Sequence, residues 1–229
     1  MSVALPLDAF AVRPRALLFD LDGTLVDTAP DLGDAANRVR EELGLAPLPL
    51  ADYRPVASAG ARGLLGLALG ITPQHAEYAA RVERFLAFYR ARLVRHSALF
   101  DGMAELLQAI GTAGLRWGVV TNKAAALTLP LLEGLALRAD CAVSADQVPR
   151  PKPAPDALLR ACELLGLPPR ACWYVGDDKR DIVAGQAAGM LTIAADWGYL
   201  GAEGPIGSWG AERIAATPHD IVAWLQASG

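Results

Sequence analysis

The sequence predicts an α/β fold in which a parallel sheet carries helices on both faces and an all-helical cap is inserted near its beginning. Two observations predict the sheet. Short apolar runs alternate with helical patterns through the second half of the 229-residue chain, and several runs end at polar or acidic turns. A third observation predicts the cap, because residues 30–95 show helical periodicity and no convincing strand.

The first elements follow an N-terminal extension, residues 1–14, to which we assign no role. Arg15–Asp20 (RALLFD) is an apolar run that stops at an acidic turn, as a buried parallel strand does. Apolar residues at helical spacing then predict one helix from about Pro30 to Gly44 and another from about Pro73 to Val94. Between them, Pro47–Gly70 reads as a loop-rich segment.

After residue 100 the pattern alternates between strand and helix. The expected strands are Leu115–Thr121, Asp140–Val143, Ala171–Gly176, Leu191–Ala195 and Arg213–Ala215. The expected helices are Ala124–Leu135, Ala154–Leu165, Arg180–Ala188 and Pro218–Gln226. We therefore expect a Rossmann-like core formed by residues 15–27 and 98–229, with a helical cap over residues 28–97.

Composition narrows the choice of partners and compartment. The formal net charge is −4 and no segment is densely basic, which argues against nucleic acid as a partner. The three cysteines form no CxxC pair, so we read them as buried thiols of a reducing cytoplasm. Residues 1–14 lack a basic n-region and no apolar run is long enough to span a membrane, so we expect neither a signal peptide nor a membrane-spanning segment. We expect a cytoplasmic monomer or homodimer that binds no membrane.

The first predicted strand ends in a pair of carboxylates, Asp20 and Asp22, followed by Gly23. Two carboxylates just past a buried strand are costly unless a cation compensates them, and Mg²⁺ is the divalent ion that suits carboxylates and phosphate together. Gly23 lets the backbone turn sharply, so that neighbouring amides can face an anion. An acidic turn closed by a glycine remains the alternative.

Two later strand ends carry groups that suit a phosphate. Thr121 and Asn122 offer a hydroxyl and backbone amides at a strand-to-helix junction, although both residue types are also common helix caps. Lys152 stands between Pro151 and Pro153, a rigid mount for a cation that must keep one position. A solvated basic loop is the alternative for this lysine.

A fourth strand end carries Asp177, Asp178 and Asp181. Acidic residues at a helix N-terminus are favoured by the helix dipole, which explains Asp178 or Asp181 better than Asp177. Because ligands of open α/β sheets bind at the carboxyl ends of the strands, we expect all four strand ends to converge on one site.

These residues fall into motifs that resemble the haloacid dehalogenase superfamily, in its phosphatase branch with a helical cap after the first motif. The resemblance covers nearly the whole chain from Arg15. The four motifs are FDLDGTLVDT (Phe19–Thr28), VVTNK (Val119–Lys123), RPKP (Arg150–Pro153) and VGDDKRDI (Val175–Ile182).

The resemblance implies a reaction centre. Asp20 would attack phosphorus and form an aspartyl-phosphate, and Asp22 would act as the general acid and base. An aspartate at position 22 indicates a phosphatase rather than a dehalogenase. Lys152 would neutralise charge on the nucleophile and on the phosphoryl group.

The resemblance also implies a Mg²⁺ site. The ion would be bound by Asp20, by Asp177 and by the backbone carbonyl of Asp22, and either Asp178 or Asp181 would orient that set of ligands. No other cofactor is expected.

Substrate binding would involve the second motif and the cap. Thr121 and Asn122 would hold phosphoryl oxygens, and Arg62 in the SAGAR loop could pair with a substrate carboxylate or remain a solvated arginine. The cap would close about hinges at Val26–Ala29 and Ser97–Gly102.

Two groups of this family compete over the substrate: the phosphoglycolate phosphatases and the N-acetylmuramic acid 6-phosphate phosphatases of peptidoglycan recycling. Four segments look more like the second group, so we favour that substrate: His96–Leu107, Trp117–Lys123, Val175–Ile182 and Trp197–Pro218. A sugar phosphomutase of the same superfamily, and a regulatory module on an inactive phosphatase fold, are the remaining alternatives.

Overall fold

The computed structural model describes residues 13–201 and 204–228, and its centre is a sheet of six parallel strands. In their order across the sheet the strands are β5 (Cys141–Ser144), β4 (Arg116–Thr121), β1 (Ala16–Phe19), β6 (Cys172–Gly176), β7 (Leu191–Ala195) and β8 (Arg213–Ala215). The predicted α/β class with a parallel sheet is therefore confirmed. Of the predicted N-terminal extension, residues 1–12 lie outside the described residues.

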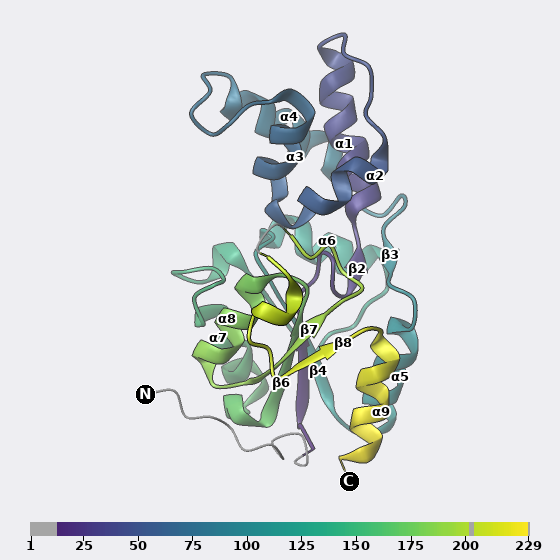
Figure 1. The fold of residues 1–229 in the computed structure, drawn as a ribbon, viewed down its shortest axis with the longest axis vertical. Helices are drawn as coiled ribbons and strands as arrows, with labels where there is room; N and C mark the ends of the chain where they lie inside the picture. Colours follow the sequence, from purple (N-terminus) through teal and green to yellow (C-terminus); the bar gives the residue numbers. More distant parts are fainter. Residues whose placement is uncertain (1–12, 202–203, 229) are drawn as a thin grey trace.

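Helices cover both faces of this sheet (Figure 1). They are α5 (Met103–Thr112), α6 (Ala125–Gly134) and α9 (Pro218–Ala227) on one face, and α7 (Asp156–Leu165) and α8 (Lys179–Ala188) on the other. Leu17 and Phe19 of β1 pack toward the first face, whereas Ala16 and Leu18 pack toward the second. Burial on both faces explains why β1 reads as a continuous apolar run. In the described ranges, no helix is long and apolar enough to cross a membrane.

A separate group of helices lies beyond the carboxyl ends of the strands, at the top of Figure 1. It consists of α1 (Ala29–Glu42), α2 (Leu50–Tyr53), α3 (Gly60–Leu69) and α4 (Tyr78–Arg90). These helices have a core of their own, in which Tyr53, Phe85 and Tyr89 are almost fully buried. The chain enters and leaves through a short antiparallel ribbon of β2 (Val26–Asp27) and β3 (Ala98–Leu99), at the positions expected for the two hinges.

The expectation that Pro47–Gly70 is rich in loops was wrong, because this segment contains α2 and the ten-residue helix α3. Glycines at positions 60, 63 and 66 weaken the helical signal of the sequence. At Gly63, however, close packing requires a glycine: a Cβ there would lie 2.6 Å from the carbonyl oxygen of Val56. Helix α5 was not predicted either, and α4 is shorter than the expected Pro73–Val94 helix.

Candidate active site

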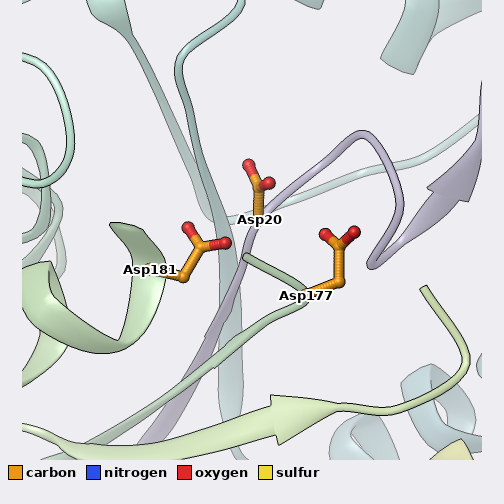
Figure 2. Close-up of side chains that lie close together, drawn as sticks. All are labelled: Asp20, Asp177 and Asp181. Atoms are coloured by element: carbon orange, nitrogen blue, oxygen red, sulfur yellow. The ribbon is translucent and has the colours of Figure 1, made fainter. Parts of the chain in front are cut away.

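Three carboxylates meet where the strands end. Asp20 directly follows β1, Asp177 directly follows β6, and Asp181 lies in the first turn of α8. Each offers an oxygen that lies within 4.8 Å of an oxygen of the other two. Figure 2 shows the three side chains turned toward a common space from three different elements. The predicted convergence of the first and fourth strand ends is therefore observed.

Lys152 reaches the same cluster from the loop that follows β5. Its Nζ lies 2.7 Å from Oδ1 of Asp20 and 2.6 Å from Oδ1 of Asp181. It also donates hydrogen bonds to the hydroxyl of Tyr174, at 2.9 Å, and to the carbonyl oxygen of Val120, at 3.0 Å. The lysine is buried, so these partners replace the water that an exposed ammonium would bind. The immediate partner of Asp181 is therefore Lys152, which it holds in position.

The ammonium of Lys152 and the carboxylate of Asp20 form a close, buried ion pair. Although the two atoms are 2.7 Å apart, Oδ1 of Asp20 has no hydrogen-bond partner of normal geometry, and its surroundings are almost closed to solvent. A buried carboxylate oxygen without a hydrogen bond is costly. Such an oxygen remains free to bind a cation or to attack an electrophile.

Burial dominates the electrostatics of the cluster. It raises the pKa of Asp20 to about 7 even though Lys152 opposes the shift. Burial, followed by the charges of Asp20 and Asp181, also holds the pKa of Asp177 well above its usual range. For Lys152, burial alone would lower the pKa, but the charges of Asp181 and Asp20 outweigh it and raise the pKa. A cation bound between Asp20 and Asp177 would allow both to ionise at neutral pH.

The residues present fit a hard divalent cation such as Mg²⁺. The donors are carboxylate oxygens, one of them lacks a hydrogen bond of normal geometry, and burial raises the pKa of Asp20 and of Asp177. Magnesium prefers this chemistry, with one or two carboxylates and the oxygens of a phosphate. Asp178 does not join the cluster through its carboxylate, which caps α8 and binds Arg180 at 2.8 Å.

Asp22 lies beside this cluster and has partners of its own. Lys123 donates to both carboxylate oxygens of Asp22, at 2.7 and 2.9 Å, and the hydroxyl of Thr28 donates to one of them. Lys123 is buried and lies over the ring of Tyr89, 4.9 Å from its centre. The sequence analysis quoted Lys123 within VVTNK but gave it no role. Its place directly after Thr121 and Asn122 was the available signal.

The tail loop after β7, Trp197–Leu200, closes the site on the side of Asp177. Tyr199 donates its backbone N–H to Oδ2 of Asp177, at 2.8 Å, and the hydroxyl of Thr24 donates to Oδ1 at the same distance. Gly198 lies so close that a Cβ there would be 2.2 Å from Cβ of Asp177. Gly23 has φ of +92° and would place a Cβ 2.3 Å from the same carboxylate. The pocket around Asp177 therefore depends on two glycines.

The side chain of Tyr199 extends from this loop to the hinge. Its hydroxyl accepts hydrogen bonds from the backbone N–H groups of Thr28 and Ala29, both at 2.8 Å, and donates to Asp27 at 2.9 Å. Arg54 lies over the Tyr199 ring, 5.1 Å from its centre, and pairs with Asp27 at 2.7 Å. The loop Trp197–Leu200 thus contacts both the Asp177 carboxylate and the start of α1 at the base of the helical unit.

Replacing Tyr199 by phenylalanine is expected to destabilise the protein by about 1–3 kcal/mol, because the buried N–H groups of Thr28 and Ala29 lose their acceptor. Chemical denaturation followed by circular dichroism measures this change. The matched control is Tyr53→Phe, which removes another buried hydroxyl whose hydrogen bond goes to Asn37 within the helical unit. Because only one hydrogen bond is lost there, we expect a smaller effect, about 1 kcal/mol. Equal stability of Tyr199→Phe and the unmodified protein would contradict the role given to this hydroxyl.

A cavity of about 380 Å³ opens above the carboxylates, between the sheet and the helical unit. Its lower wall contains Asp20, Asp22, Thr121, Asn122, Lys123, Lys152, Asp178, Arg180 and Asp181. Its upper wall contains Leu32, the segment Ala57–Ala61, Phe85, Leu86, Tyr89 and Arg90. Ala124, which precedes α6, and Ala126 and Leu127 of α6 complete the lining. The cavity is thus polar at its base and largely apolar toward the helices.

The predicted binding residues occupy different positions around this cavity. Thr121 lines it, whereas the Asn122 side chain exchanges two hydrogen bonds with the backbone of Lys152, at 2.9 and 3.0 Å, and so fixes the lysine loop. Arg62 is exposed on the first turn of α3 and is not among the lining residues. Arg180 was not predicted. It lines the cavity and donates to the carbonyl oxygen of Ser58, at 2.8 Å, linking α8 to the helical unit.

Comparisons with known proteins agree with this geometry. The model of the haloacid dehalogenase-like hydrolase family matches residues 17–195. A Xanthomonas campestris protein named phosphoglycolate phosphatase is 43% identical over 222 residues, which cover 93% of this chain and 98% of the relative. A Pseudomonas aeruginosa protein named N-acetylmuramic acid 6-phosphate phosphatase is 40% identical over 213 residues, covering 92% and 94%. A crystal structure of a predicted phosphoglycolate phosphatase from Haemophilus somnus superposes with a TM-score of 0.80, at 26% identity and covering 91% and 96%.

Proposed function

Because this chain belongs to the haloacid dehalogenase-like hydrolases, and its relatives at 40–43% identity are phosphatases, we propose that it hydrolyses a small carboxylate-bearing phosphate monoester with Asp20 as nucleophile. The observation that carries the proposal is the state of Asp20. Its buried Oδ1 has no hydrogen bond of normal geometry and stands 2.7 Å from the Lys152 ammonium, and the residue lines the base of the cavity. A nucleophile needs these features: a free lone pair and a nearby positive charge.

In the first half of the proposed reaction, a carboxylate oxygen of Asp20 attacks phosphorus and the bond from phosphorus to the ester oxygen breaks. Asp22 gives its proton to the departing alkoxide. The Lys123 ammonium, already 2.7 Å from Asp22, stabilises the carboxylate that this transfer leaves. Lys152 offsets negative charge on the phosphoryl group beside Asp20.

In the second half, Asp22 takes a proton from a water molecule, whose oxygen attacks phosphorus. The bond between phosphorus and Asp20 breaks, so the Asp20 carboxylate is restored and inorganic phosphate leaves. Lys123, whose Nζ lies 2.7 Å from the Asp22 carboxylate, holds this group in place for the step. Asp22 thus serves as the general acid in the first half of the reaction and as the general base in the second.

We propose that Mg²⁺ is held by the carboxylates of Asp20 and Asp177 and by the backbone carbonyl of Asp22. When bound, the ion neutralises charge on the carboxylates and on the phosphate, which is the main requirement of phosphoryl transfer. The raised pKa of Asp177 supports this assignment, because that carboxyl has no cationic side chain paired with it among the described residues. Asp181 pairs with Lys152, so we propose that it positions this lysine rather than binding the ion.

The size and lining of the cavity favour N-acetylmuramic acid 6-phosphate over 2-phosphoglycolate. A volume of about 380 Å³ falls in the range of ~300–1,000 Å³ that holds drug-sized ligands, far more than a glycolate group occupies. Leu32, Phe85 and Leu86 give the upper wall an apolar character that suits the methyl groups of a lactyl ether and an acetamide. We therefore favour the sugar acid phosphate, with 2-phosphoglycolate as the alternative.

A panel of phosphate esters tests this function. With Mg²⁺, we expect kcat/KM for N-acetylmuramic acid 6-phosphate to exceed that for 2-phosphoglycolate by ~10-fold or more, because the larger substrate fills the apolar wall. Phosphate release is measured for both, with p-nitrophenyl phosphate as the reference for the chemical step and EDTA as the metal-free control.

The panel also separates the alternatives. A preference for 2-phosphoglycolate would replace the favoured substrate, and an isomerised sugar phosphate in place of free phosphate would identify a phosphomutase. Full activity in EDTA, after removal of bound metal, would contradict the proposed Mg²⁺ site.

A further inference from the structure

Four cationic side chains line the cavity, and three of them have carboxylate partners. Lys123 pairs with Asp22, Lys152 with Asp20 and Asp181, and Arg180 with Asp178, all at 2.6–2.8 Å. Arg90 is different. It makes no ion pair and no side-chain hydrogen bond with any residue in the ranges 13–201 and 204–228, although it lines the same cavity. Arg90 is therefore the lining cation whose charge has no protein partner within those ranges.

The position of Arg90 places it on the substrate wall contributed by the helices. It is the last residue of α4, and Leu86, one helical turn before it, also lines the cavity. Phe85 and Tyr89, again one turn apart and stacked with parallel rings, line it too. One side of α4 therefore faces the cavity, and Arg90 adds a guanidinium group at the end of this side. Asp20 and Asp22, by contrast, belong to the strand end at the base.

We propose that Arg90 binds the carboxylate of the substrate's leaving group and determines specificity for phosphate monoesters that carry one. This inference rests on the proposed function, which supplies a substrate with two anionic ends. At the base, Lys152 would bind the phosphate end, and the residues proposed for Mg²⁺ would hold the ion there. The second anionic end then lies toward the helices, where Arg90 offers a planar fork of N–H donors that matches a carboxylate.

The existing ion pairs favour Arg90 over the other lining cations as the group that binds the substrate carboxylate. Lys123 and Arg180 are engaged by Asp22 and Asp178, so their use by a substrate would leave a buried or half-buried carboxylate unpaired. Binding to Arg90 breaks no existing pair. Arg62 was named for this role in the sequence analysis, with a solvated arginine as the alternative. Arg62 and Arg90 are both exposed, but only Arg90 lines the cavity.

The test compares two sugar phosphates that differ at one group. N-acetylmuramic acid 6-phosphate carries the lactyl carboxylate, and N-acetylglucosamine 6-phosphate lacks it. For Arg90→Met we expect kcat/KM on the first to fall ~10- to 100-fold, mainly through KM, because a charge-assisted pair is lost. On the second, kcat/KM should change less than about twofold, since no carboxylate is present. Arg90→Lys should recover part of the loss, because it restores the charge without the fork.

Arg95→Met is the matched control. Arg95 is exposed a few residues further along the chain and does not line the cavity, so neither substrate should be affected. The inference is overturned if Arg90→Met slows both sugar phosphates equally, if it slows neither, or if Arg62→Met shows the selective loss instead. Failure of the proposed substrate class has a different signature: the unmodified enzyme itself would show no preference for the carboxylate-bearing sugar phosphate.

Discussion

Replacement of Asp20 by asparagine is expected to lower kcat for every phosphate ester by ~10⁴-fold or more, as loss of a covalent nucleophile does in other enzymes. The amide has nearly the same shape as the carboxylate, but its oxygen is a poor nucleophile toward phosphorus. The neighbouring groups stay in place, since Lys152 keeps its contacts with Asp181 and Tyr174. Phosphate release from p-nitrophenyl phosphate and from the preferred substrate measures the effect.

The same variant should be no less stable than the parent protein in the absence of Mg²⁺. The pKa of Asp20 is about 7 in the folded protein against an ordinary 3.8, so ionisation of this carboxyl disfavours the folded state. That penalty appears as the pH rises above the ordinary value and is complete above the folded pKa, near pH 7. Asparagine carries no charge and escapes it.

Asp52→Asn is the control for this pair of expectations, because it makes the same chemical change at an exposed site on α2. It should leave turnover unchanged. Near-normal turnover of Asp20→Asn would exclude the covalent mechanism. A large loss of stability in Asp20→Asn would instead show that the carboxylate is structural, and the kinetic result could then not be assigned to nucleophilic attack.

The sheet was predictable because burial on both faces gives its strands an unbroken apolar pattern. Leu191–Ala195 and Arg213–Ala215 were predicted with the bounds that the structure has. Helix α3 was missed for the opposite reason. Its glycines weaken local helix propensity, whereas its stability comes from burying Leu64 and Leu65 against the other helices. Tertiary packing of this kind leaves little trace in a short window of sequence.

The base of the site was also predictable, because Asp20 and Asp177 directly follow strands and Lys152 lies in the loop after another. Asp20, Lys152 and Asp177 meet as the order of motifs indicated. The contacts of Tyr199 with Thr28 and Asp177 were not predictable, because they join segments 171 and 22 residues apart and depend on the path of a loop. Arg90 was missed because an arginine at the end of an amphipathic helix has the pattern of a solvated one.

Lys152→Met is expected to have the second large effect. Methionine is similar in length but carries no charge, so Asp20 and Asp181 lose a cation that lies within 2.7 Å of both. We expect kcat to fall by ~10³-fold, the upper end of what loss of one stabilising donor costs. The free energy of unfolding should fall by about 3–5 kcal/mol, as when one partner of a buried ion pair is removed. Steady-state kinetics and chemical denaturation measure the two effects.

Lys179→Met provides the matched control, since Lys179 begins α8 and is only partly buried, without an ion pair among the described residues. It should change neither quantity appreciably. If Lys152→Met kept kcat within about tenfold of the parent, the proposed charge support of the phosphoryl group would be wrong, because an oxyanion donor of this kind contributes more.

A double variant separates the two roles of Lys152. Adding Asp181→Asn to Lys152→Met removes one of the two uncompensated buried carboxylates, so much of the lost stability should return. Catalysis should not return with it, because Asp20 would still face the phosphate without the ammonium that stood 2.7 Å away. Recovery of both stability and kcat would mean that the lysine is needed only to hold Asp181 in the fold. Recovery of stability alone would assign the lysine to the reaction, with Asp181 as the residue that positions it.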